Sequence, residues 1–356
     1  MKKAWGAGGR ISSMPVDAGG AGDVSTAHAS ERRERSRTTK VGSILDRIAL
    51  PIVWILLIIV FGALKPSSFL TTGNMSAILG SQGVLVVLAL ALIIPLRAGD
   101  YDLSIGGTLT LSSMMIGVMN ANMHISILVA ILCALLAGIL IGLFNAGVSL
   151  YFGINPFITT LGMGTLLLGI VLLISNDQTI AGISPGLVSV VIIDQFLHIP
   201  LVFYYVLILA LVLFYIFDFT ALGRRLLFVG SGRDVARLSG VKVGRVRAGA
   251  LVASGFLAAL AGVLYAGTSG AANPSSGANL LLPAFAAAYL GATTIIPGRF
   301  NPWGTVLASY FLVTGVTGLA ILGINSWVQD VFYGGALIVA VALSQLARRR
   351  QVQELG

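Results

Sequence analysis

Two acidic side chains stand close together between long apolar segments. Asp100 and Asp102 occur in the stretch Arg97-Ala-Gly-Asp-Tyr-Asp-Leu-Ser104. Carboxylates in such a place could bind a proton or a sodium ion, as in ion-coupled carriers. A purely structural interpretation also fits, in which Asp102 or Ser104 caps the next helix and Asp100 pairs with Arg97. Both interpretations stay open at the level of the residues.

Motifs for ATP binding, metal binding and covalent catalysis are missing from the sequence. None of the five lysines follows a glycine, so the Gly-Lys-Ser/Thr of a P-loop does not occur. The three histidines are isolated, and Cys133 is the single cysteine. These absences disfavour metal sites and His-dependent nucleophiles. We therefore expect a non-catalytic conduit, without cofactor or metal, rather than an enzyme.

The composition of the chain indicates what kind of element holds Asp100, Asp102 and their neighbours in place. Only 10% of the side chains are charged, 56% are hydrophobic and the mean hydropathy is +0.95, whereas a soluble domain has about 25% charged residues. The net charge of +9 does not indicate a nucleic-acid partner, because residues 98–223 contain no lysine or arginine. A stretch of that kind suits hydrocarbon. The sequence predicts a polytopic integral membrane protein that is all-α.

Apolar runs of about 17–25 residues, the length that spans a bilayer as helix, follow one another from residue 48 onward. We predict about ten transmembrane helices, at residues 48–64, 75–96, 103–121, 125–151, 157–175, 201–217, 248–267, 280–296, 303–322 and 328–346.

Positive charge predicts the orientation, because lysine and arginine are enriched in cytoplasmic loops. With ten spans and a cytoplasmic N-terminus, every basic loop falls inside and the outside loops hold Lys65 alone. We therefore place both termini in the cytoplasm. Residues 1–47, rich in Gly, Ala, Ser and Arg, are expected to be a disordered basic tail. Residues 48–347 form the transmembrane domain, and 348–356 a second cytoplasmic tail.

The inside loop over residues 223–247 carries seven of the cations. Within it, residues 232–240 predict a short helix that stops at Gly240. Val235 and Leu238 share one face of this helix, while Arg233 and Arg237 lie on another. Such a helix could place apolar side chains in a groove of a cytoplasmic partner. Alternatively, its cations only enforce topology and contact lipid headgroups.

Six motifs occur in order along the chain: Asp102-Leu-Ser-Ile-Gly106, Gly142-Leu-Phe-Asn145, Ile154-Asn-Pro-Phe-Ile-Thr-Thr-Leu-Gly162, Ala236-Arg-Leu-Ser-Gly-Val241, Leu290-Gly-Ala-Thr293 and Pro297-Gly-Arg-Phe-Asn-Pro-Trp-Gly-Thr305. Together they resemble a known family, the permease subunits of ribose-type (simple sugar) ABC importers in the branched-chain amino acid/ribose permease superfamily. The similarity runs in register from about residue 75 to 346.

This resemblance implies a multi-pass subunit of the bacterial inner membrane. Its implied partners are a cytoplasmic ABC ATPase, a periplasmic sugar-binding protein, a second permease subunit in a homodimer or heterodimer, and the lipid bilayer, with no nucleic acid. It also implies that the helix within 223–247 is the coupling helix. The residues expected to face or frame the ATPase are Arg233, Asp234, Val235, Arg237, Leu238 and Ser239.

The chain departs from the family pattern in two places. The common form Gly-Gly-Ile-Asp-Leu-Ser is here Gly99-Asp-Tyr-Asp-Leu-Ser104, with an additional acid, and the eighth span reads Leu282-Pro-Ala-Phe285 where many members carry acids. Both departures indicate a variant subgroup, so the substrate cannot be copied from ribose. Branched-chain amino acids or nucleosides on the same machinery, and an ion-coupled carrier that uses Asp100 and Asp102, remain alternatives.

A sugar pathway needs uncharged donors and acceptors at helix ends and breaks. The same polar side chains could instead bond one membrane helix to another, and the glycines at 138 and 142 fit close helix packing. The candidates for the pathway are Gln82, Asp102, Ser104, Asn145, Asn155, Thr160 and, at the outer mouth, Asn273.

Overall fold

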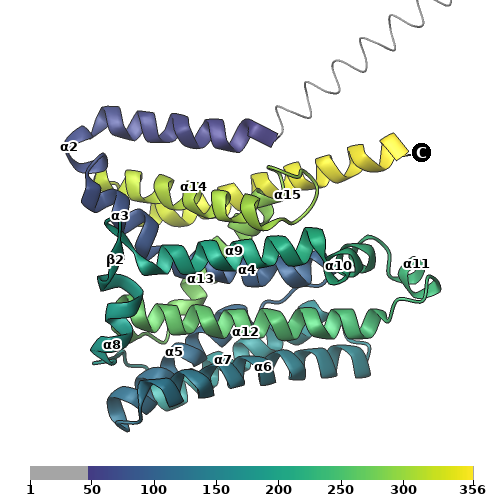
Figure 1. Cartoon of the computed structure of the whole chain (residues 1–356), viewed down its shortest axis with the longest axis horizontal. Coiled ribbons are helices and arrows are strands. Elements are labelled where there is room, and N and C mark those ends of the chain that lie inside the picture. The colour runs from purple at the N-terminus through teal and green to yellow at the C-terminus, as the bar shows by residue number, and fades with distance from the viewer. Residues whose placement is uncertain (1–46, 356) are drawn as a thin grey trace, which may run out of the picture. The chain divides into compact units, whose positions relative to one another are not determined.

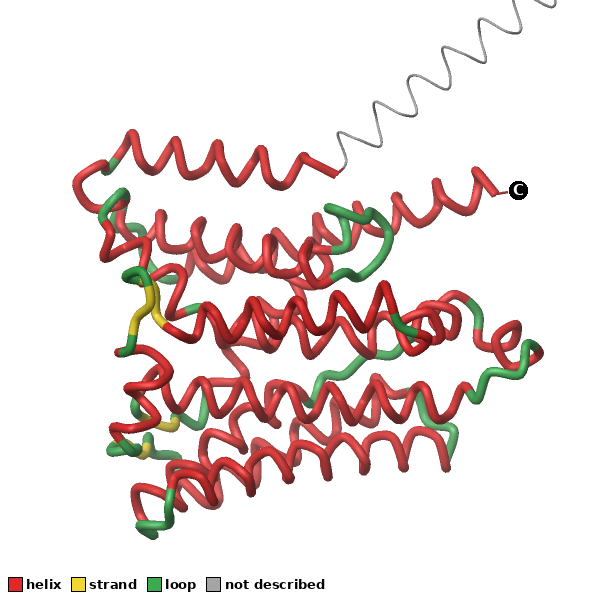
Figure 2. The backbone as a smooth tube through the Cα atoms, in the orientation of Figure 1, coloured by secondary structure: helices red, strands yellow, loops and turns green. Residues whose placement is uncertain are grey.

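The computed structural model describes the backbone of residues 47–355, with side chains for 47–80 and 82–344. The expected N-terminal tail, apart from Arg47, lies outside the described residues. Long helices run side by side over most of the described chain (Figures 1 and 2). A helix over Arg47–Leu64 comes first. The elements that follow are α2 (Pro66–Phe69), α3 (Thr72–Ser81), α4 (Gly83–Arg97), α5 (Ile105–Ile116), η1 (Gly117–Asn122), α6 (Ile127–Tyr151), α7 (Pro156–Ser175), β1 (Ile180–Ala181), α8 (Pro185–Val188), η2 (Ser189–Ile193), β2 (Gln195–Phe196), β3 (Ile199–Pro200), α9 (Leu201–Phe219), α10 (Ala221–Ser231), α11 (Arg233–Leu238), α12 (Val243–Ser269), β4 (Ala271–Ala272), α13 (Ser276–Gly291), α14 (Pro302–Ile321) and α15 (Trp327–Leu355).

The prediction of an all-α polytopic membrane protein is confirmed. Among the described residues, eight helices are long and apolar enough to cross a bilayer. The third and eighth predicted spans correspond to shorter helices: α5 has 12 residues and continues into the π-helical turn η1, and α13 has 16 residues. The second span is interrupted by a turn at Gln82, where α3 ends and α4 begins. Ten crossings therefore remain a prediction.

Helix α4 forms the centre of the bundle. All 15 of its residues are buried, and α12, α13, α14 and α9 pack around it. Its sequence is apolar on every side, which is typical of a helix with no lipid-facing or solvent-facing stripe. The chain enters the middle of the molecule at α4 and leaves it through Arg97 and the segment that carries Asp100, Asp102 and Ser104.

Helix α6 instead has two different faces. Leu128, Leu132, Leu136 and Leu140 recur every fourth residue and are 55–65% exposed. The opposite stripe is buried against α12, where a Cβ at Gly138 or Gly142 would stand 2.5–2.6 Å from backbone atoms of α12. Glycine therefore permits a close contact between these backbones, and the expected packing role of both residues is confirmed.

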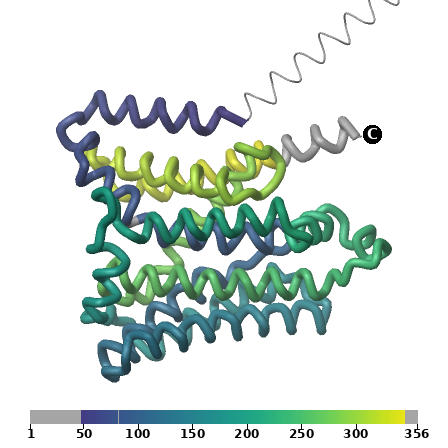
Figure 3. Tube along the Cα trace, in the orientation of Figure 1, coloured from purple at the N-terminus to yellow at the C-terminus, as the bar shows by residue number. Residues whose placement is uncertain are grey.

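The two ends of the bundle differ in structure. One end carries the short antiparallel pairs β1–β4 and β2–β3 together with α8. The opposite end carries α10 and α11, as the colour path shows (Figures 1 and 3), and the backbone of α15 runs toward that side (Figure 1). This separation agrees with the predicted orientation, in which the basic segment over 223–247 lies inside and Asn273 lies at the outer mouth.

The basic segment over 223–247 contains more helix than predicted. The expected short helix is confirmed as α11, and Gly240 follows it with φ +80°. The residues before it, predicted as loop, form α10, and α12 already begins at Val243. Thr220 begins α10 by accepting a hydrogen bond from the Gly223 backbone N–H at 3.3 Å, a regular N-cap.

Candidate translocation and coupling site

Asp100 joins three elements at the end of the bundle that carries α11. Its side chain is fully buried, and its carboxylate accepts hydrogen bonds from Arg233 Nη2 of α11 at 2.6 Å and from Arg247 of α12 at 2.7 and 3.0 Å. Arg233 Nη2 also donates to the Gly99 carbonyl at 2.8 Å. One buried negative charge is thus matched by two guanidinium groups, the arrangement in which a carboxylate tolerates burial.

The expected pairing of Asp100 with Arg97 is wrong. Arg97 donates to the Phe217 and Phe300 carbonyls at 3.1 and 3.2 Å and lies 3.7 Å from Asp218. Its guanidinium also stacks over the Phe217 ring at 4.3 Å. The reason is the backbone between the two residues: Gly99 has φ +78° and turns the chain, so that Asp100 faces α11 and α12 while Arg97 faces α9.

A second polar cluster surrounds Asp102 in the interior. Asp102 Oδ1 accepts hydrogen bonds from the Ser104 hydroxyl at 2.6 Å and from the Ser104 backbone N–H at 3.0 Å. Asn145 Nδ2 of α6 donates to the Ser104 hydroxyl at 2.9 Å. Ser104 is the N-cap residue of α5, but its side chain does not cap that helix. A cap from the Ser104 side chain is therefore wrong, and that hydroxyl instead links the 100–104 segment to α6, while Asp102 accepts the backbone N–H at the start of α5.

Thr160 of α7 fixes the same segment from another side. Its hydroxyl accepts a hydrogen bond from the Leu103 backbone N–H at 3.0 Å and donates to the Pro156 carbonyl at 2.8 Å. Four of the predicted pathway residues, Asp102, Ser104, Asn145 and Thr160, thus meet within one buried network, each at most 1% exposed. These four residues connect the 100–104 segment to α6 through Asn145 and to α7 through Thr160.

Three oxygen atoms around this network have no hydrogen-bond partner among the described residues. They are Asp102 Oδ2, Asn145 Oδ1 and Ser254 Oγ, all buried. Ser254 lies on α12, near the Asp102 carboxylate, and its hydroxyl is able to donate to that group. Buried polar atoms are normally satisfied, so these three oxygens set the region apart from ordinary helix packing.

The other predicted pathway residues lie outside this network. Asn155 begins α7 by accepting a hydrogen bond from the Phe157 N–H at 3.1 Å, and Asn273 accepts one from the Ser275 N–H at 2.8 Å before α13. Gln82 occupies the turn between α3 and α4. The structure therefore gives Asn155 and Asn273 local capping or turn contacts, and it does not bring these three residues together.

Helix α11 presents most of its predicted coupling residues to the surface. Val235 and Leu238 are 59% and 88% exposed, while Ala236 between them is fully buried. Asp234, Arg237 and Ser239 are exposed as well. Arg233 differs, because its guanidinium turns back to Asp100 with 41% of the side chain exposed. The helix therefore has an apolar outer face and a charged attachment to the bundle.

Sequence reasoning missed Arg247, which is the less exposed of the two Asp100 partners at 14%. It also missed Tyr101, whose hydroxyl receives a hydrogen bond from Tyr289 at 3.0 Å. The sequence did contain a signal for Arg247. Asp100 is an additional acid relative to the family pattern, a buried acid needs a cation as partner, and the nearest dense group of cations lies at 224–247.

Comparison with known proteins places the chain in a family. The family model described as branched-chain amino acid transport system / permease component matches residues 74–341. The D-allose transport system permease protein AlsC of Escherichia coli K12 is 30% identical over 301 residues, 85% of this chain and 92% of that protein.

Two further relatives give the same result. The ribose import permease protein RbsC of Bacillus subtilis 168 is 32% identical over 295 residues, 82% of this chain and 90% of that protein. The autoinducer 2 import system permease protein LsrC of Salmonella typhimurium LT2 is 30% identical over 296 residues, 83% of this chain and 84% of that protein. No solved structure matches. This chain, a multi-pass membrane protein, belongs to the family of branched-chain amino acid transport system permease components.

Proposed function

We propose that this chain is the permease subunit of an ABC importer that moves a sugar across the bacterial inner membrane. A periplasmic binding protein delivers the sugar, a separate cytoplasmic ATPase supplies the energy, and a second permease subunit completes the membrane part. The chain itself is not an enzyme. Relatives named for D-allose, ribose and autoinducer 2 import support a sugar-like substrate.

The observation that carries this proposal is the two-sided character of α11. Its exposed face holds Val235 and Leu238, and burying a leucine or valine side chain contributes roughly 1.5–3 kcal/mol. Its other side is tied through Arg233 to Asp100, inside the bundle. A partner that binds the apolar face can therefore act on the interior through a charged, hydrogen-bonded contact. This is what a subunit without its own P-loop needs in order to use ATP.

In the alternative of an ion-coupled carrier, Asp100 and Asp102 would bind the ion, but Asp100 is already paired in the structure. The Asp100 carboxylate is occupied by two guanidinium groups, so it lacks the free coordination that an ion-coupling residue needs. Asp102 remains a candidate for ion binding, because no cation pairs with it among the described residues.

An Asp102→Asn variant distinguishes an ABC importer from an ion-coupled carrier. If the chain is part of an ABC importer, ATP-driven uptake persists at least in part in this variant. If the chain is an ion-coupled carrier, the variant loses its requirement for sodium or protons.

Changing the exposed face of α11 tests the proposal. The variant Val235→Asp/Leu238→Asp should insert normally but lose ATPase binding and at least 90% of ATP-dependent sugar uptake, because carboxylates replace the apolar contact. Uptake is measured in proteoliposomes with the ATPase and the binding protein, using labelled D-ribose, D-allose and L-leucine. The variant Ile324→Asp, at a 40% exposed position in the turn after α14, is the insertion control.

Normal uptake by the α11 variant would disprove the coupling role. Uptake of L-leucine without either sugar would retain the ABC machinery and replace the proposed sugar by a branched-chain amino acid.

A further inference from the structure

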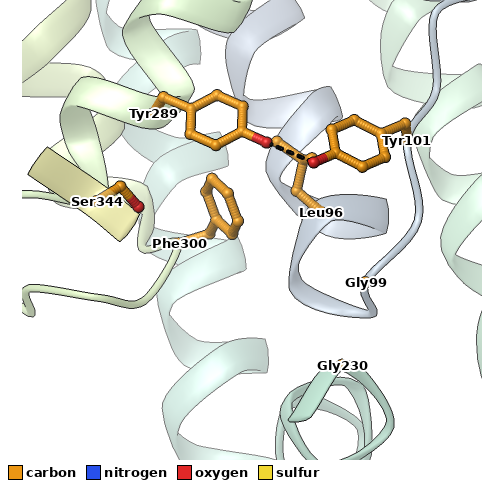
Figure 4. A pocket seen from close by; sticks show the side chains of 7 residues that line it. All are labelled: Leu96, Gly99, Tyr101, Gly230, Tyr289, Phe300 and Ser344. Carbon is orange, nitrogen blue, oxygen red and sulfur yellow. Dashed lines mark hydrogen bonds between the residues drawn. The ribbon is translucent and has the colours of Figure 1, made fainter. Parts of the chain in front are cut away.

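A cavity of about 200 Å³ lies beside Asp100, at the end of the bundle that carries α11. Five parts of the chain enclose it: the end of α4 with the segment after it, α10, α13, the segment after α13, and α15. Figure 4 shows the Tyr101 and Tyr289 side chains facing each other across the cavity, with the Phe300 ring next to them. The lining residues are Leu96, Gly99, Tyr101, Gly230, Tyr289, Phe300 and Ser344.

The cavity combines aromatic rings with hydroxyl groups. Tyr289 donates a hydrogen bond to Tyr101 at 3.0 Å, and its ring meets the Phe300 ring edge to face, with centroids 5.3 Å apart. Each tyrosine hydroxyl can donate and accept, and each ring offers an apolar surface. Ser344 adds a third hydroxyl-bearing side chain. This mixture suits a ligand that has C–H faces and several hydroxyl groups.

Charge and size narrow the class of ligand. None of the described lining residues is ionised at neutral pH, so the cavity offers no partner for the ammonium and carboxylate groups of an amino acid. Its volume of about 200 Å³ lies below the ~300 Å³ at which drug-sized pockets begin. A single small, neutral, polar ring fits these limits.

One wall of the cavity is attached to α11. Arg233 holds both the Gly99 carbonyl and the Asp100 carboxylate, the two residues that precede Tyr101. Gly230 lies against the same turn: a Cβ there would collide with the Arg97 carbonyl, so a glycine allows α10 to close against the end of α4. A movement of α11 would therefore move the segment that carries Tyr101, a residue that is 40% exposed.

We propose that this cavity is a binding site for one neutral monosaccharide ring, held by the Tyr101 and Tyr289 hydroxyls and by the Phe300 ring. The choice of a sugar rests on the proposed function. The position of the site, beside α11 and away from the end that carries α8 and β1–β4, makes it a site on the release side of the pathway. The sugar would displace the hydrogen bond between the two tyrosines and replace it with its own hydroxyl groups.

Saturation-transfer difference NMR on the full chain in lipid nanodiscs tests this site directly, because it detects weak binding without the partner subunits. The probes are D-ribose and D-allose, with L-leucine as the charged comparison. We expect saturation of the C–H protons of at least one sugar. The signal should fall about fivefold or more in Tyr289→Phe, which removes only a hydroxyl, and in Phe300→Leu, which removes the ring. Tyr151→Phe, at an 85% exposed position, should match the unmodified chain.

Three results would overturn the site: no saturation of either sugar, signals unchanged in both cavity variants, or a stronger effect for L-leucine. The melting temperature of each variant, measured in the same nanodiscs, should stay within a few degrees of the unmodified value. Tyr101→Phe provides a second hydroxyl deletion if one of the others unfolds. Sugar uptake by the assembled transporter without binding in the cavity would contradict this inference alone. Binding in the cavity without any sugar uptake would contradict the proposed function alone.

Discussion

At the scale of residues, Asp100 connects the surface helix α11 to the interior. Removing one partner of a buried ion pair is strongly destabilising, by about 3–5 kcal/mol, because the remaining charge is left without compensation. A partly exposed partner contributes less, since water screens it. The Arg247 side chain is 14% exposed and that of Arg233 is 41% exposed. The two arginines should therefore contribute unequally to stability.

We predict that Arg247→Met lowers the melting temperature of the purified chain more than Arg233→Met does, and that Asp100→Asn lowers it as well. Asp330→Asn, at an exposed position, should leave it unchanged. Differential scanning fluorimetry in detergent measures all four variants. Equal melting temperatures for Asp100→Asn and the unmodified chain would show that the ion pair does not stabilise the fold.

The residues also show where sequence reasoning reaches its limit. Asp102, Ser104, Asn145 and Thr160 were proposed separately, as polar side chains at helix ends and breaks, and the structure brings them together through hydrogen bonds that the sequence did not predict. The pairing of Asp100 with Arg97 failed because it assumed that neighbours in sequence point the same way. The positive φ of Gly99 separates them, and a backbone turn of that kind cannot be read from charge spacing.

At the scale of elements, glycines allow a close backbone contact between α6 and α12. A Cβ at Gly142 would lie 2.6 Å from the Leu251 carbonyl and from the Val252 Cα, so alanine there must push the helices apart. The same face of α6 carries Asn145, which reaches Ser104. Small residues thus bring α6 and α12 together, and the Asp102 cluster lies where they meet.

We predict that Gly142→Ala lowers the melting temperature and the yield of folded protein, because a backbone clash replaces a close contact. Gly147→Ala is the matched control on the same helix, since a Cβ at that position would have no neighbouring atom within 4 Å. It should have no effect or a small stabilising one, because alanine favours helix over glycine. Size-exclusion chromatography and thermal unfolding measure both. Identical behaviour of the two variants would contradict the packing role.

Most element positions were accessible from hydropathy, because apolar runs of spanning length are a strong signal. The third span, predicted at 103–121, corresponds to α5 and η1 together. The eighth, predicted at 280–296, begins four residues earlier and ends five residues earlier as α13, since hydropathy does not report where a buried apolar segment stops being helical. Helix α10 was missed because its cations made the segment look like a loop, although its residues also carry an apolar face with Leu226 and Val229 buried.

At the scale of the whole molecule, the predicted orientation requires an even number of membrane crossings between α11 and each terminus. Cysteine labelling tests it. In a Cys133→Ala background, Leu238→Cys at 88% exposure should be protected in intact cells from a membrane-impermeant maleimide. Leu197→Cys, 73% exposed at the opposite end of the bundle, should react. Reaction of Leu238→Cys from outside the cell would invert the orientation.

The proposed function requires that ATP hydrolysis on another subunit drives sugar import through this chain. Reconstitution in proteoliposomes tests it most directly, with sugar uptake measured with the ATPase, the binding protein and ATP, and again for the chain alone under a proton or sodium gradient. We predict uptake of D-ribose or D-allose only in the complete, ATP-containing system. Accumulation of either sugar by the chain alone, driven by an ion gradient and abolished in Asp102→Asn, would contradict it.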